Sequence, residues 1–392
     1  MKRMRGGLAL AAVAVIAVGA CSSSGGSAAP SLPTTVGDGE GALNVVAWAG
    51  YVVGGTGGEQ VEGYDWVTPF EDATGCKVTV KVGLDSANMV QLMKTGEYDG
   101  VSASGDATLR LIAGGDVSPV NFDLIPNYKD VYAGLKGQSY NTVNGLGYGV
   151  PHGRGANLLM WNPDAVQAAP DSWNVVFDAD SPYKGKVTAY NYAIYIADAA
   201  VYLMATKPDL GIKNPYSLDE TQLAAAVDLL KQQRTLIGKY WVTAQEEIDG
   251  FANGDMTIGT SWQYQANVIN SVEGGVKVET VKPKEGTTGW SDTWMISSKA
   301  AHPNCMYKWM DWITSPAVNA QVAEYFGEAP AQTKACEHTS QKDFCDIYHA
   351  TDEKFASEIH YWTTPQKQCV DGSGDNCTAY DEWVDKWQQI KG

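Results

Sequence analysis

Strand-like and helix-like segments alternate along residues 43–113. The strand-like segments are rich in β-branched and aromatic residues, and the first two helix-like segments end directly before a glycine, a common helix stop. The expected strands are 43–48, 76–82 and 98–102, and the expected helices are 66–74, 87–95 and 108–113. This alternation predicts an α/β fold built from strand–helix units.

The same two patterns recur farther along the 392-residue chain, which is long enough for two ordinary domains. We expect helices at 223–236, 246–252 and 305–314 and a strand at 256–261. The sequence shows no internal repeat.

The first 21 residues have the pattern of an export signal. A basic start is followed by an apolar run over 8–18, which is too short to span a bilayer, and then by Cys21. This arrangement resembles a bacterial lipobox, although a secretory signal with a chance cysteine is the alternative. We expect a signal peptide at 1–20, a lipidated Cys21 and a flexible Ser/Gly/Pro-rich linker over 21–41. The mature protein is then anchored by lipid to the outer face of the cytoplasmic membrane, in the cell envelope or periplasm.

Six further cysteines form an even set, as expected for disulfides in an oxidising compartment. Short spacings favour Cys336–Cys345 and Cys369–Cys377, which leaves Cys76–Cys305 as a long-range bridge. Spacing alone does not decide among the 15 possible pairings. The cysteine and histidine spacings do not match a metal site.

The charge and aromatic balance restrict the type of partner. A net charge of −17 argues against nucleic acid, whose phosphates require a basic face. The chain has 13 Trp and 20 Tyr but 7 Phe, so most aromatic rings carry a polar group. Such rings suit stacking on polar or cationic small molecules, and core packing is the alternative interpretation.

The common catalytic signatures are missing from the sequence. We find no G-x-S-x-G, Walker A or H-E-x-x-H motif, and the glycine run 54–58 is followed by no Lys-Ser/Thr pair. We therefore expect a binding protein without enzymatic activity, metal or cofactor, and keep a secreted enzyme as a less favoured alternative.

Several short segments, in order, resemble the spermidine/putrescine-binding proteins of bacterial ABC importers. They cover most of the mature chain, and the block 283–292, PKEGTTGWSD, is the most specific. The others are 46–51 (VAWAGY), 96–101 (GEYDGV), 148–151 (YGVP), 183–186 (YKGK) and 259–262 (GTSW). The resemblance implies a two-lobe, periplasmic-binding-protein-like α/β fold with two hinge crossings. Lobe 1 would comprise 42–152 and 291–331, and lobe 2 would comprise 153–290 and 332–392.

The resemblance also implies a site between the lobes. Trp48 and Tyr51 would form one wall and Trp262 and Trp290 the others, with Asp292 as the central carboxylate and Ser104 lining the site. Aromatic faces and paired carboxylates are what an alkyl chain with ammonium ends requires. The implied partners are a polyamine, or a related small cationic ligand, and a membrane permease. We expect a monomer that binds no nucleic acid.

Four positions depart from the family pattern. Tyr192 and Tyr195 stand where the family often has acids, although Asp198 lies nearby. Conversely, Asp106 and Glu328 stand where the family has tyrosines. These exchanges predict an amine held in a changed or reversed pose.

Arg154 is a further departure, because an arginine beside the cleft can hold a carboxylate. It leaves open a zwitterionic amino acid, another organic amine or a sugar as the ligand, and a hinge salt bridge is the alternative role for this arginine.

Overall fold

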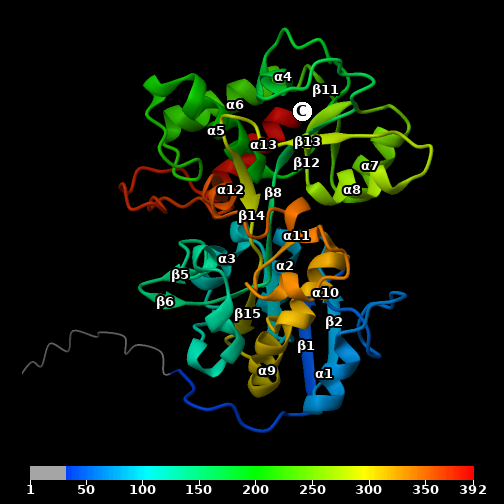
Figure 1. Ribbon diagram of the computed structural model, residues 1–392. Coiled ribbons are helices and arrows are strands. Elements are labelled where there is room, and N and C mark those ends of the chain that lie inside the picture. The colour runs from blue at the N-terminus through cyan, green and yellow to red at the C-terminus, as the bar shows by residue number, and fades with distance from the viewer. Residues whose placement is uncertain (1–31) are drawn as a thin grey trace, which may run out of the picture. The chain divides into compact units, whose positions relative to one another are not determined.

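The computed structural model describes residues 32–392, and the expected signal peptide and Cys21 lie outside the described residues. The strands form three main sheets, as the alternating pattern predicts (Figure 1). The first sheet has the order β2-β1-β3-β15-β4, with β7 paired to β15. Its strands are β1 (Ala42–Ala47), β2 (Lys77–Val82), β3 (Gly100–Ala103), β4 (Val117–Ser118), β7 (Val150–Pro151) and β15 (Thr293–Ser297).

Strands β1, β2 and β3 are parallel, so crossover helices connect them. The helices and turns that follow these strands and β15 are α1 (Val67–Thr74), α2 (Ser86–Thr95), α3 (Gly105–Ala113), η1 (Phe122–Leu124), η2 (Pro126–Asp130), η3 (Ala133–Leu135), α9 (Pro303–Ile313) and α10 (Pro316–Phe326). A two-stranded hairpin, β5 (Thr142–Val143) and β6 (Leu146–Gly147), adjoins them. The expected elements of 43–113 are confirmed to within a few residues.

The second sheet has the order β11-β10-β12-β9-β13. Its strands are β9 (Leu158–Trp161), β10 (Val187–Tyr190), β11 (Ile237–Trp241), β12 (Ile258–Ser261) and β13 (Glu279–Val281). Its helices and turns are α4 (Asn174–Phe177), η4 (Ala193–Tyr195), α5 (Ile196–Thr206), η5 (Pro208–Leu210), α6 (Glu220–Gln233), α7 (Ala244–Ala252), α8 (Gln263–Ser271) and α13 (Tyr380–Lys391). Helices α6 and α7 begin with capping boxes at Asp219 and Thr243. Helix α6 ends three residues earlier than expected, because the Leu236 carbonyl accepts a hydrogen bond from Gly185.

Each of these sheets has its own hydrophobic core. Phe70 and Trp309 lie in the core beside the first sheet, and Trp173 and Trp383 lie in the core beside the second. The structure therefore has two lobes, built on the first and second sheets (Figure 1).

A four-stranded sheet connects the two lobes. It has the order β16-β8-β14-β17, with β8 (Gly153–Ala156), β14 (Thr287–Trp290), β16 (Ala329–Pro330) and β17 (Ile359–Tyr361). The chain crosses from β7 to β8 through His152 and from β14 to β15 through Ser291 and Asp292. The His152 amide donates to the Asp292 carbonyl at 2.8 Å, so the two crossings lie side by side.

The remaining elements follow β16 and belong to the C-terminal part of the chain. They are η6 (Ala335–Glu337), α11 (Phe344–Ile347) and α12 (Glu353–Ser357). Phe344 and Ala350 pack with Ala323 of α10, on the first lobe. This packing departs from the expected boundary at 331/332, which placed the segment in lobe 2, because the chain folds back onto α10 before it returns to α13 on the second lobe.

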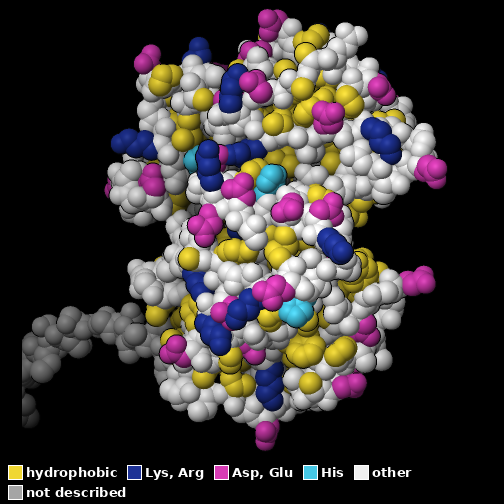
Figure 2. Space-filling model, viewed as in Figure 1, with side chains coloured by type: hydrophobic (Ala, Val, Ile, Leu, Met, Phe, Trp, Pro, Cys, Tyr) yellow, Lys and Arg dark blue, Asp and Glu magenta, His cyan; other side chains and the backbone are white. Residues whose placement is uncertain are grey.

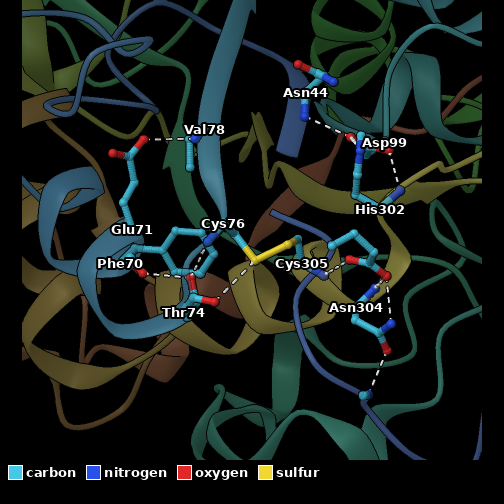
Figure 3. Close-up of a disulfide and its surroundings, with 12 residues drawn as sticks. Asn44, Phe70, Glu71, Thr74, Cys76, Val78, Asp99, His302, Asn304 and Cys305 are labelled. Carbon is cyan, nitrogen blue, oxygen red and sulfur yellow. Dashed lines mark hydrogen bonds and ion pairs between the residues drawn. A yellow bond between two sulfur atoms is a disulfide. The ribbon is translucent and has the colours of Figure 1, made fainter. Parts of the chain in front are cut away.

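The three expected disulfides, Cys76–Cys305, Cys336–Cys345 and Cys369–Cys377, are present. The first connects the residue before β2 to α9, with the Thr74 and Asn304 side chains beside it (Figure 3). None of the helices in residues 32–392 has both the length and the apolar run needed to cross a bilayer.

Candidate functional site

A cavity of about 360 Å³ lies between the lobes, where several strands of both main sheets end. Most of its residues follow the carboxyl ends of β1, β2, β3, β10, β11 and β12 or lie at the β14–β15 crossing. Ligands of open α/β sheets bind at such strand ends. Of the ten residues expected at the site, seven line this cavity: Trp48, Ser104, Asp106, Tyr192, Trp262, Trp290 and Asp292.

Aromatic rings form most of the wall. Trp262 packs edge-on against Trp290 at 6.1 Å between ring centroids, and Trp290 packs edge-on against Phe326 at 5.8 Å. Trp48, Tyr192 and Trp362 complete the aromatic lining. Phe326 and Trp362 were not expected from the sequence, because Phe326 ends helix α10 and Trp362 follows the short strand β17, and neither element carries a family-like motif.

Asp292 brings a carboxylate to the cavity with one oxygen left open. It is 3% exposed, and its Oδ2 accepts a hydrogen bond from the Tyr51 hydroxyl at 2.9 Å. Its Oδ1 has no hydrogen-bond partner among residues 32–392. Burial raises the pKa of Asp292 to about 6, and the nearby Asp106 charge also raises it. A buried acceptor without a partner is costly, so this oxygen is available to a ligand donor.

Asp106 is the second carboxylate, in the first turn of α3. Its Oδ1 accepts from Ser86 at 2.9 Å and its Oδ2 from the Tyr380 hydroxyl at 3.3 Å. Tyr380 belongs to α13, so this contact joins the two lobes. Burial raises the pKa of Asp106 to about 6, although the bond from Ser86 and the Arg110 charge lower it in part.

The charged side chains of the cavity wall are acidic. Among the described residues that line it, Asp106 and Asp292 are the only charged side chains. Elsewhere acidic and basic side chains are interspersed on the visible face of both lobes (Figure 2). The excess of acids in the sequence is therefore mostly surface, whereas the two cavity carboxylates act without a basic neighbour in the wall.

Tyr51 and Glu328 lie behind Asp292 rather than in the cavity wall. Tyr51 is fully buried, and its ring packs 3.9 Å from that of His152. Glu328 is also fully buried, with its Oε1 3.6 Å from His152 Nε2. Burial and the Asp292 charge raise the pKa of Glu328 well above its usual value. Glu328, which we expected to contact a cation, does not line the cavity and packs against the hinge at Gly153.

Tyr195 does not line the cavity either. Its hydroxyl accepts from Gln233 Nε2 at 2.8 Å inside the second-lobe core. Asp198 is also buried away from the cavity and accepts from the Tyr190 hydroxyl. The lost family acids are therefore not replaced on this side, whereas Tyr192 lines the cavity with its hydroxyl bonded to the Val242 carbonyl.

Arg154 has a structural partner. Its Nη2 donates to the carbonyls of His349 and Ala350 at 3.0 and 2.8 Å, and its guanidinium lies over the Tyr132 ring. It does not line the cavity. The Arg154 guanidinium therefore binds backbone carbonyls beside the hinge, and within residues 32–392 it does not form the salt bridge considered as an alternative.

Comparison with known proteins finds relatives and a solved structure with the same fold. Two relatives are 26% identical. One is the putrescine/agmatine-binding protein of Pseudomonas aeruginosa, over 67% of this chain and 75% of that protein. The other is the putrescine-binding periplasmic protein of Escherichia coli, over 75% of this chain and 78% of that protein.

A solved structure shares the fold. It is the spermidine/putrescine ABC transporter substrate-binding protein of Streptococcus pneumoniae, with a TM-score of 0.68 and 18% identity over 90% of this chain and 99% of that one. The profile of one family, described as bacterial extracellular solute-binding protein, matches residues 65–344. Since this match spans most of both lobes, the chain belongs to the family of bacterial extracellular solute-binding proteins.

Proposed function

We propose that this protein is the solute-binding component of an ABC importer and binds a polyamine such as putrescine or spermidine. The observation that carries the proposal is the cavity itself, whose wall, as the described residues form it, holds two buried carboxylates, four tryptophans and no basic side chain. Asp292 accepts one ammonium group and Asp106 accepts the other. The tryptophan faces cover the methylenes and make cation–π contacts. The names of the two relatives support the same ligand class.

The proposal includes delivery and location. The loaded protein closes its lobes about the hinge and is recognised by a membrane permease, without chemistry on the ligand. It acts as a monomer attached through lipidated Cys21 to the outer face of the cytoplasmic membrane. Cys21→Ser should release the protein into the soluble fraction, and retention on the membrane would contradict the anchor.

A matched set of ligands tests the binding proposal. Putrescine and γ-aminobutyrate have similar chain lengths, but γ-aminobutyrate replaces one ammonium by a carboxylate. Putrescine at 100 times its Kd should stabilise the folded protein by about 2.7 kcal/mol and raise its Tm. γ-Aminobutyrate should leave Tm unchanged. A Tm increase with γ-aminobutyrate or a sugar, together with no increase for any amine that lacks a carboxylate, would overturn the proposal.

Binding should weaken in acid. An ammonium group is bound by the ionised carboxylates, and the pKa of both Asp106 and Asp292 is about 6 in the free protein. At pH 8 both are ionised, whereas at pH 5 each must lose a proton. We therefore expect the putrescine Kd to rise by about 10-fold per carboxylate between pH 8 and pH 5, measured by calorimetry. A Kd independent of pH would contradict the assignment of these carboxylates.

The ligand-free protein should show the opposite pH dependence of stability. Burial raises the folded pKa of both groups to about 6, above the ordinary value of an aspartate, so the folded state binds more protons than the unfolded state between about pH 4 and 6. Stability from these groups therefore falls as pH rises through that window, by about 3 kcal/mol per group.

A further inference from the structure

One tryptophan of the cavity wall is held by a chain of buried polar side chains. The Trp262 indole Nε1 donates to Asn157 Oδ1 at 2.8 Å. Asn157 Nδ2 donates to the Tyr190 hydroxyl at 3.2 Å and to Thr288 Oγ1 at 2.6 Å. The Tyr190 hydroxyl in turn donates to Asp198 Oδ2. Asn157, Tyr190 and Thr288 are fully buried, and Asp198 is 4% exposed.

At pH 8, above the pKa of about 7 to which burial raises Asp198, its ionised carboxylate can only accept, and the donors and acceptors in this chain allow one arrangement. An indole N–H can only donate, so the Asn157 atom facing it must be the carbonyl oxygen. The amide nitrogen is then directed at Tyr190, whose single hydroxyl proton remains for Asp198. Every link from Trp262 to Asp198 therefore donates in the same direction, and such chains strengthen each bond through mutual polarisation.

The Trp262 ring is also held by T-shaped packing against two neighbouring tryptophans. Trp241 packs edge-on against it at 4.9 Å and Trp290 at 6.1 Å between ring centroids. These contacts place the ring in the wall, whereas the bond to Asn157 sets its rotation. A cation–π contact requires the ring face, not its edge, to face the ammonium group.

We propose that Asn157 is a positioning residue for the ligand and acts by fixing the Trp262 ring through this chain. This inference rests on the proposed function. Without Asn157 Oδ1, the indole N–H would be left buried without an acceptor, and the ring would rotate to reach a new one.

Asn157→Leu should raise the putrescine Kd about tenfold at pH 8. A double-mutant cycle separates positioning from a general loss of structure. In a Trp262→Phe background, Asn157→Leu should change Kd by less than about twofold, because the ring on which it acts is gone. An equal change in both backgrounds would overturn the inference.

Gln233→Leu is the matched control. Gln233 is fully buried in the same lobe and donates to Tyr195, which does not line the cavity. Gln233→Leu should lower Tm about as much as Asn157→Leu does, while leaving the putrescine Kd unchanged. If Gln233→Leu raised Kd as much as Asn157→Leu, loss of any buried polar side chain in this lobe would weaken binding, and the proposal would be overturned.

The indole N–H resonance of Trp262 provides a readout that needs no ligand. In protein labelled with ¹⁵N at the indole nitrogen, this resonance is the one lost in Trp262→Phe. It should move in Asn157→Leu, and in the same direction but less far in Tyr190→Phe, which removes the next link without touching Trp262. If wild-type protein bound no amine, the proposed function would fail, and an unmoved resonance would separately overturn the positioning role.

Discussion

Asp292→Asn is expected to weaken putrescine binding by about 100-fold or more at pH 8. Truncating one partner of a buried charge pair costs about 2–5 kcal/mol, and each 1.4 kcal/mol is a tenfold change in Kd. Asparagine has the shape of aspartate and keeps an acceptor for the Tyr51 hydroxyl, which lies 2.9 Å from Asp292 Oδ2. The variant therefore loses the charge while retaining the local hydrogen bond.

The same substitution should stabilise the ligand-free protein. The carboxylate is buried and one of its oxygens has no partner among residues 32–392, so its charge opposes folding at pH 8. We expect a higher Tm together with weaker binding, a combination that misfolding cannot produce. Calorimetric titration and thermal unfolding of one preparation measure both.

Two further variants calibrate this result. Asp375→Asn removes an exposed carboxylate and should change neither Kd nor Tm by a measurable amount. Asp106→Asn should weaken binding by about tenfold, less than Asp292→Asn, because Ser86 and Tyr380 already satisfy its oxygens. A Kd for Asp292→Asn within threefold of wild type would remove Asp292 from the binding role.

The site was predictable where a residue follows a strand that the sequence itself marks. Trp48 follows β1 and Trp262 follows β12, and both strands are recognisable from their composition. Parallel strands bring their carboxyl ends to the same edge of a sheet, and one such edge of each main sheet borders the cavity, so Trp48 and Trp262 meet there. Asp106 was predictable as the second carboxylate because it lies just after β3, another recognisable strand.

The sequence did not predict which residues lie behind the cavity wall instead of lining it. Glu328 directly precedes β16 of the connecting sheet, but it faces His152 instead of the cavity. Whether such a residue reaches the cavity depends on the side-chain direction in a two-residue strand, for which the sequence has no periodic signal. Phe326 and Trp362 were missed because tertiary packing alone brings them to the wall.

The C-terminal boundary shows a similar limit. A spacing of nine residues made Cys336–Cys345 a plausible clip. The spacing contained no information on the lobe against which the disulfide packs. In the structure, the residues around this disulfide pack on α10 of the first lobe. Local cross-links are therefore easier to predict than the surface to which they attach.

Removal of the long-range disulfide, by Cys76→Ala with Cys305→Ala, is expected to have the largest effect on stability. The bridge closes a loop with a sequence separation of 229, whereas Cys369–Cys377 closes one of 8. Loop-closure entropy predicts about 5 kcal/mol for the first and about 2.5 kcal/mol for the second. Urea unfolding of the two double variants, compared with wild type under non-reducing conditions, measures the difference.

The position of the bridge strengthens this expectation. Cys305 lies in the first turn of α9, and Glu40 accepts hydrogen bonds from the amides of Asn304 and Cys305. Farther along α9, Trp309 packs edge-on against Phe70 at 5.2 Å in the first-lobe core. Cys76 precedes β2 on the same lobe, so the bridge connects the sheet to the helix that covers it (Figure 3).

The two double variants should also differ in which part of the protein opens. Without Cys76–Cys305, hydrogen exchange should increase first in β1, β2 and α9, whereas without Cys369–Cys377 it should increase around α13 on the second lobe. Equal losses of stability in the two variants would show that loop length does not govern the effect. Because β1 leads directly to Trp48, loss of the long bridge should also lower the temperature at which putrescine binding fails, whereas loss of the short clip should leave that temperature closer to the wild-type value.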